Sequence, residues 1–201
     1  MDSLGQSGVL GQIDKYGETL KGEEADDALY FILGGANDYC MYTDFNFDTT
    51  TVDAVAATTI ENFETAIRKL AALGGKDILL SYAHDVSTMP YEITSGRVEI
   101  AKEYTKTVNA ALPELTKKLE KELNIDITTF DITKVTDSMI SSPGKYGFSE
   151  FVNVVQPTWP EVLPAVTENV ESYMYFDEWH PTAKMHKVIG ESLYKTIRKI
   201  K

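Results

Sequence analysis

Asp177 and His180 are the residues whose types and spacing best suit acid–base chemistry. They lie three positions apart in the segment Phe176-Asp177-Glu178-Trp179-His180-Pro181-Thr182. A carboxylate next to an imidazole has three functional interpretations: an orienting acid with a general base, two metal ligands, or a pH-sensitive ion pair. The non-functional interpretation is a loop in which the aspartate caps a helix and the histidine packs on Trp179.

The element that must position this pair is a C-terminal helix. Pro181 suits the first turn of a helix, where its missing N–H costs nothing. From Ala183 to Lys199 apolar residues recur at helical spacing, at Met185, Val188, Ile189, Leu193 and Ile197. We therefore expect Asp177 and His180 in the loop before a docked helix.

A second polar segment follows an apolar run. The run from Ala28 to Leu33 has strand length and leads into Gly34-Gly35-Ala36-Asn37-Asp38. Such a run is typical of a strand covered on both faces of a parallel sheet, and the glycines allow a sharp turn at its end. Asp77 to Tyr82 and Ile125 to Ile132 are predicted as two further strands.

Helices are predicted between these strands, which indicates an α/β fold with a parallel sheet in one domain, residues 1–201. Their ranges are Gly8 to Leu20, Thr51 to Leu73, Glu92 to Leu123, with a kink or break at Pro113, and Thr133 to Ile140. Ligands of such sheets bind at the carboxyl ends of the strands. The loops at Gly34–Asp38, His84–Asp85 and Asp177–His180 are thus expected on one face.

The composition excludes several classes of partner and site. A net charge of −12 argues against nucleic acid and anionic membranes, and the single cysteine, Cys40, excludes an internal disulfide and a Cys-based zinc cluster. No apolar run reaches membrane-spanning length, and Met1 to Gln6 does not look like a secretory signal. We expect either a cytosolic protein or a sequence that begins downstream of its true start.

The motifs G-G-A-N-D and D-x-W-H-P-T together resemble the third and fifth sequence blocks of the GDSL-type, or SGNH, serine hydrolases. The likeness extends to Gln12–Tyr16 and to Ser142–Phe148, which is similar to the P-x-x-Y-G-F segment of the lipase-like branch. The resemblance implies a three-layer α/β/α, flavodoxin-like fold and hydrolysis of carboxylic esters through an acyl-enzyme. It implies no metal and no cofactor, a small-molecule, lipid or sugar ester as substrate, and secretion.

The resemblance also implies roles for individual residues. Asn37 would donate its amide to the oxyanion of a tetrahedral intermediate, and Gly35 would give Asn37 its approach. His180 would act as general base and then as general acid, while Asp177 would orient and stabilise the imidazole. Without the resemblance, Asn37 can equally be a turn residue next to glycine.

The nucleophile block of the family is the part that this sequence does not match. Met1-Asp2-Ser3-Leu4 spells three letters of it, but no strand precedes Ser3, and only the 33 positions from 4 to 36 separate Ser3 from Asn37. A nucleophile needs rigid placement within reach of its base. We therefore expect an N-terminally truncated domain whose nucleophile is missing, with Ser3 as the remaining candidate.

Truncation suggests an alternative function. Without the first strands of the sheet, the strand at Leu29–Leu33 would lie at an open edge, which invites pairing with another chain. The alternative is a catalytically inactive remnant that binds ligand or self-associates through this edge.

The remaining candidates concern substrate contacts. His84 is either a substrate contact or a solvated loop histidine beside Asp85. An apolar cluster after Asn37 is the candidate pocket wall, formed by Tyr39, Met41, Tyr42, Phe45 and Phe47. Trp159 and its neighbouring prolines either line an acyl pocket or lid, or stiffen an irregular loop: Pro157, Pro160 and Pro164.

Overall fold

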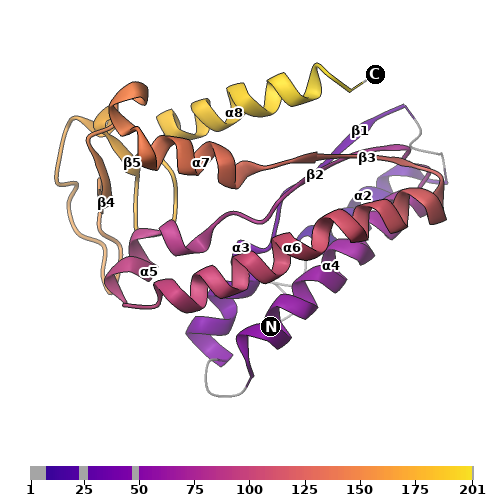
Figure 1. Cartoon of the computed structure of the whole chain (residues 1–201), viewed down its shortest axis with the longest axis horizontal. Helices are drawn as coiled ribbons and strands as arrows, with labels where there is room; N and C mark the ends of the chain where they lie inside the picture. Colours follow the sequence, from indigo (N-terminus) through magenta and orange to yellow (C-terminus); the bar gives the residue numbers. More distant parts are fainter. Residues whose placement is uncertain (1–7, 23–26, 47–49, 201) are drawn as a thin grey trace. The chain divides into compact units, whose positions relative to one another are not determined.

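A computed structural model describes residues 8–22, 27–46 and 50–200 of the chain (Figure 1). They form two compact units. The first runs to His84 and resumes over Tyr104–Phe130, and the second comprises Asp85–Glu103 and the chain from Asp131 onward. The single domain expected from the sequence stays a prediction, and each unit is described below by itself.

The first unit is built on a three-stranded parallel sheet. Its strands are β1 (Leu29–Ile32), β2 (Asp77–Ser81) and β3 (Asp126–Phe130), in the order β1-β2-β3. Tyr30 lies opposite Ile78, and Ile78 opposite Ile127. All three strands were predicted, and the prediction of an α/β fold with a parallel sheet is confirmed.

The strands differ in how far they are buried. In the central strand β2, the four residues from Ile78 to Ser81 are almost inaccessible to solvent. In β1 the alternate side chains of Leu29 and Phe31 are exposed, as is that of Leu33 just beyond it. The expectation that the first strand is covered on both faces is wrong, because an unbroken apolar run does not reveal which sides of a strand have a covering layer.

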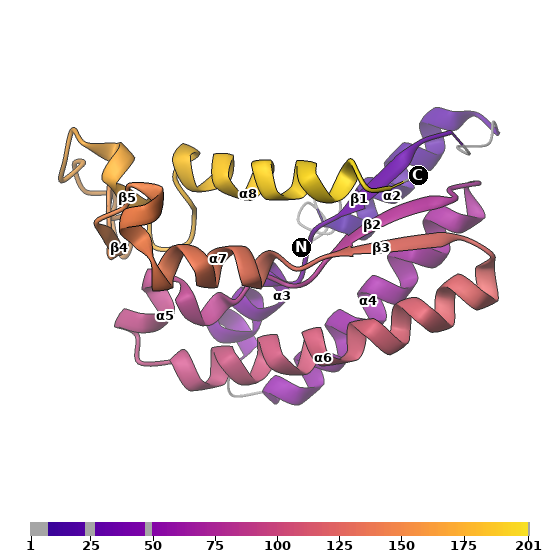
Figure 2. The same cartoon turned by 45° about the horizontal axis from the view of Figure 1, so that its top comes forward.

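Helices α2 (Val9–Leu20) and α4 (Val52–Ala72) of the first unit pack against one another. Helix α4 and the long helix α6 (Val98–Leu123) run side by side in both views (Figures 1 and 2). Charged side chains join α4 to α6, since Arg68 pairs with Glu122 and Lys118 pairs with Glu64. These three helices agree closely with the predicted ranges, except at the start of α6.

The predicted helix at Glu92–Leu123 is interrupted at its beginning, not at Pro113. Helix α5 (Pro90–Thr94) ends before Gly96, whose φ of 71° only glycine adopts readily, and α6 then continues through Pro113. The side chain of Pro113 is exposed, so water can replace the backbone hydrogen bond that proline removes.

The second unit contains α5, α7 (Ile132–Ser141), α8 (Ala183–Ile197) and two short parallel strands, β4 (Glu150–Val154) and β5 (Tyr173–Tyr175). Helices α7 and α8 were predicted, whereas β4 lies in a segment for which no strand was predicted. Its sequence Glu-Phe-Val-Asn-Val is interrupted by polar residues and lacks the apolar run that marked the other strands, and none of its residues is fully buried. None of the helices in the described ranges is long and apolar enough to cross a membrane.

Candidate active site

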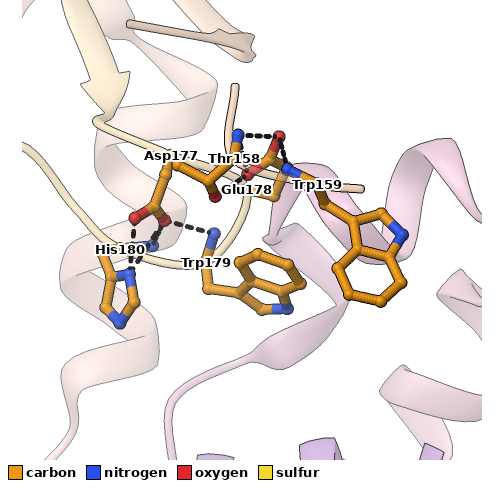
Figure 3. A network of polar contacts seen from close by, with 6 residues as sticks. All are labelled: Thr158, Trp159, Asp177, Glu178, Trp179 and His180. Carbon is orange, nitrogen blue, oxygen red and sulfur yellow. Dashed lines mark hydrogen bonds and ion pairs between the residues drawn. The ribbon is translucent and has the colours of Figure 1, made fainter. Parts of the chain in front are cut away.

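Asp177 and His180 form a close pair in the loop between β5 and α8. The Nδ1 atom of His180 lies 2.7 Å from Oδ2 and 2.9 Å from Oδ1 of Asp177. Asp177 Oδ1 also accepts the backbone N–H groups of Trp179 and His180, at 2.9 and 2.7 Å. The carboxylate thus fixes both the ring of His180 and the turn that carries it (Figure 3).

This arrangement selects one tautomer of His180. An ionised carboxylate only accepts hydrogen bonds, so the proton of a neutral imidazole must sit on Nδ1 to satisfy the contact. The lone pair then lies on Nε2, at the edge of the ring farther from Asp177 (Figure 3). The side chain of His180 is 74% exposed while that of Asp177 is 13% exposed, so the acid is sheltered and the base is open to a ligand.

The loop is closed on itself by backbone hydrogen bonds. Phe176 N–H donates to the carbonyl of His180 at 2.8 Å, and Thr182 N–H donates to that of Met174 at 2.9 Å. Thr182 is also the N-cap of α8, because its Oγ1 accepts Met185 N–H at 3.3 Å. The non-functional interpretation of the motif made Asp177 the cap of this helix, but the cap is Thr182.

Strand β5 is anchored immediately before this loop. Tyr175 is fully buried, and its hydroxyl lies 3.0 Å from Thr88 Oγ1, in the 3₁₀ turn Val86–Thr88. Burial raises the pKa of Tyr175 to about 12, so the phenol stays protonated and can keep this hydrogen bond at physiological pH. Tyr175, the last residue of β5, is thus held in place just before the Asp177–His180 loop.

An aromatic cluster includes one residue of this loop, Trp179, and two residues from outside it. Tyr91, Trp159 and Trp179 have ring centroids 4.7 to 6.2 Å apart, and Arg97 lies 4.8 Å above the ring of Tyr91. Trp159 nevertheless keeps 59% of its surface exposed. Two interpretations of Trp159 were predicted, a residue of an acyl pocket or lid and a residue that stiffens an irregular loop. Its edge contacts with Tyr91 and Trp179 fit the second.

In the first unit, the end of β1 leads through Gly35 into the short helix α3 (Ala36–Met41). Gly35 is buried and has a φ of 96°, and a Cβ at this position would lie 3.2 Å from that of Ala83. Glycine is therefore required both by the backbone conformation and by close packing. Asn37 is the second residue of α3 and is exposed, which makes its amide accessible to a ligand.

Helix α6 fixes the backbone of this turn. The hydroxyl of Tyr104 donates to the carbonyl of Gly35 at 2.5 Å and lies 2.9 Å from Thr59 Oγ1. Burial raises the pKa of Tyr104 well above that of an exposed tyrosine, so the phenol remains a donor. One turn farther along, Asn109 donates to the carbonyl of Ala83 and accepts its N–H, at 2.9 and 2.8 Å.

The sequence analysis did not identify Tyr104 and Asn109 as residues that hold the loops of the first unit. Tyr104 and Asn109 are polar groups on or beside the buried face of α6, which is otherwise lined by residues such as Val108 and Leu112. A polar group in an apolar stripe was the available signal, since buried polar groups in proteins nearly always have partners.

The other predicted site residues have varied surroundings. Tyr39 is fully buried against Tyr42 and Tyr104, so its ring presents no surface to a ligand. His84 is half-buried beyond the end of β2. Ser3 and Phe47 lie outside the described residues.

The structure thus brings Asp177 and His180 together in the second unit, and Gly35 and Asn37 in the first. The first pair can supply an oriented general base, and the second an amide donor at a glycine turn.

Comparison with known proteins identifies the family. The family model of GDSL-like Lipase/Acylhydrolase matches residues 4–193. GDSL esterase/lipase At1g58525 of Arabidopsis thaliana is 23% identical over 196 residues, which cover 89% of this chain and 55% of the relative. GDSL esterase/lipase At1g20120 of the same plant is 22% identical over 94% of this chain and 46% of its own length. GDSL esterase/lipase APG, also of Arabidopsis thaliana, is 24% identical over 83% of this chain and 52% of its own length. The chain spans about half the length of these curated relatives, and it belongs to the GDSL-like lipase/acylhydrolase family.

Proposed function

We propose that this chain carries the base, the orienting acid and part of the oxyanion hole of a serine hydrolase that cleaves carboxylic esters. The observation that carries the proposal is the Asp177–His180 pair, in which Nδ1 is engaged by the carboxylate and Nε2 is open. Family membership supports the same chemistry.

The reaction follows from the roles of these atoms. Nε2 of His180 takes the proton of a serine hydroxyl as its oxygen attacks the ester carbonyl, and Asp177 stabilises the imidazolium that forms. The amide of Asn37 donates to the oxyanion of the tetrahedral intermediate. As the intermediate collapses, His180 gives the proton to the leaving alcohol, and water then cleaves the acyl-enzyme by the same steps.

The proposal leaves the nucleophile unassigned, and Ser3 is the candidate that the partial match to the family's first block offers. A nucleophile for this chemistry needs a hydroxyl within hydrogen-bond reach of His180 Nε2 and close to the ester carbonyl carbon. Substitution of Ser3 is therefore included in the test.

The test is hydrolysis of p-nitrophenyl acetate and butyrate by the chain and by its variants. We expect His180→Ala to lower kcat on the order of 10⁴-fold, as loss of a catalytic base typically does. His186→Ala is the matched control, because His186 is an exposed histidine of α8 outside the proposed site. Equal turnover by the parent chain and by His180→Ala would refute the role of His180 as the base, and loss of turnover in Ser3→Ala would assign the nucleophile.

A second candidate function is self-association through the edge of β1. Within the described part of the chain, β1 pairs only with β2, and Leu29, Phe31 and Leu33 present exposed apolar side chains along it. An exposed apolar edge strand is a template for pairing with another chain. This candidate requires no nucleophile.

A further inference from the structure

Glu178 makes a set of hydrogen bonds that the proposed chemistry does not use. Thr158 N–H donates to its two carboxylate oxygens at 2.9 and 3.0 Å, and Thr158 Oγ1 donates to Oε2 at 2.6 Å. Trp159 N–H donates to Oε1 at 3.2 Å. The carboxylate of Glu178 thus accepts hydrogen bonds from three donor groups of Thr158 and Trp159, about 20 positions upstream in the chain (Figure 3).

These contacts favour the charged form of Glu178. Burial alone would raise the pKa of this carboxyl, but the hydrogen bonds from Thr158 and Trp159 outweigh it and hold the pKa below its ordinary value. Hydrogen bonds to an ionised carboxylate are among the stronger ones in proteins.

The backbone of Glu178 is held from another direction as well. Tyr91 N–H, in α5, donates to the carbonyl of Glu178 at 3.1 Å, and the Tyr91 ring lies 4.7 Å from that of Trp179. Arg97 lies 4.8 Å from the centre of the Tyr91 ring and pairs with the buried carboxylate of Glu92 at 3.4 Å. Glu178 therefore sits between α5 and the Thr158–Trp159 turn, fixed to both.

We propose that Glu178 is a positioning residue for His180, because its carboxylate fastens the turn at Thr158 and Trp159 to the loop that carries the base. His180 is largely exposed, so little packing orients its ring. Its orientation comes from Asp177, which holds the ring together with the backbone N–H groups of Trp179 and His180. Glu178 lies inside the turn Asp177–His180. The hydrogen bonds of its side chain therefore hold the backbone whose N–H groups bind Asp177.

The catalytic consequence rests on the proposed function, but the positioning itself can be measured without turnover. The chain has only two tryptophans, Trp159 and Trp179, and both lie in the aromatic cluster beside Glu178. Tryptophan emission therefore reports on this region alone. Exchange of the Trp179 and His180 backbone amides with solvent, followed by NMR, reports on the hydrogen bonds to Asp177.

The variants are Glu178→Ala, Glu178→Gln and the matched control Glu161→Ala, which removes an exposed carboxylate between β4 and β5. In Glu178→Ala we expect the two amides to exchange about tenfold faster or more, and tryptophan emission to shift to the red, because three donors lose their charged acceptor. Glu178→Gln should have a smaller effect, since its amide oxygen can still accept the two backbone N–H groups. Glu161→Ala should change neither signal.

Unchanged amide exchange in Glu178→Ala would overturn the proposal, even if the emission shifted, because Glu178 would then hold only the Thr158–Trp159 turn. If Glu178→Ala does not fold, as judged by circular dichroism, amide exchange is measured instead in Glu178→Gln and in Thr158→Val, which removes the hydroxyl donor. Exchange of the Trp179 and His180 amides that is unchanged in both variants would then overturn the proposal. In a chain that hydrolyses p-nitrophenyl acetate, the positioning role further predicts a lower kcat with little change in KM. Failure of the proposed function would appear separately, as activity that does not depend on His180.

Discussion

Next to the proposed oxyanion donor, Asp38 carries a charge in surroundings that disfavour it. Burial raises the pKa of its carboxyl above the ordinary value, although Asn62 donates a hydrogen bond to Oδ1 at 3.1 Å and partly offsets this effect. A carboxyl whose pKa is raised on folding binds protons more tightly in the folded state. Its contribution to stability is therefore present at acidic pH and is lost as the pH rises through the folded-state pKa.

Asp38→Asn should stabilise the folded chain at neutral pH, because it removes the partly buried carboxylate charge. The new amide oxygen can still accept the hydrogen bond from Asn62, while no charge is buried. We expect the free energy of unfolding to increase by roughly 0.5–1 kcal/mol at pH 7 and to differ little from that of the parent at acidic pH, close to the ordinary pKa of aspartate, about 4.

Urea unfolding at the two pH values measures this difference. Asp44→Asn, which neutralises an exposed carboxylate of the same segment, is the control and should shift stability less. A stabilisation by Asp38→Asn that is equal at both pH values would show that its cause is not the charge.

At the scale of elements, α6 fixes two loops of the first unit through two side chains. Tyr104 holds the turn after β1 through the carbonyl of Gly35, and Asn109 holds the segment after β2 through both backbone groups of Ala83. Close packing of Gly35 on Ala83 joins these two loops to one another. The presentation of Asn37 thus depends on a helix that contains none of the family's motifs.

Tyr104→Phe tests this dependence, because it removes one hydroxyl and leaves the ring. The carbonyl of Gly35 would lose a buried donor, which typically costs about 1–3 kcal/mol of stability. We expect that loss in urea unfolding and, in a chain that turns over ester, a lower kcat through displacement of Asn37.

Tyr82→Phe is the control, since Tyr82 is half-buried and follows β2 in the same unit. It should leave both quantities nearly unchanged. Stability and kcat that are the same in Tyr104→Phe as in the parent would show that the turn after β1 is held by other contacts.

At the scale of the whole molecule, local patterns predicted most of the architecture. Apolar runs ending in glycine or polar residues marked β1 and β2, and helical periodicity marked α2, α4, α7 and α8, because these signals reside in consecutive residues. β4 and β5 were missed because short, half-buried strands carry no such signal. The exposed side of β1 was missed because burial depends on elements that are distant in sequence.

The candidate site divides in the same way. Asp177 and His180 lie within one short motif, so their pairing could be predicted, and the structure has it at 2.7 Å. The contact of Tyr104 with Gly35 spans 69 positions and that of Glu178 with Thr158 spans 20, and no local pattern encodes either. The residues proposed to bear the chemistry were therefore accessible from sequence, while the residues that contact their loops from a distance in the chain were not.

Self-association, the second candidate function, is a property of the whole molecule. If β1 pairs with another chain, Phe31→Lys should weaken association about tenfold or more, because a lysine on an edge strand opposes pairing. Sedimentation velocity over a range of concentrations measures this. Tyr194→Lys, at an exposed aromatic residue of α8, is the control, and a parent chain that stays monomeric at all concentrations would rule out this function.

The discontinuous make-up of the two units has a consequence for the order of events during synthesis. All segments of the first unit have been translated once residue 130 is added, so the contacts of Gly35 with Tyr104 and of Ala83 with Asn109 can form early. Tyr91, by contrast, is made long before its partners Glu178 and Trp179. The hydrogen bond and the ring contact that join α5 to the Asp177–His180 loop can therefore form only after residues 178 and 179 have been added, late in synthesis.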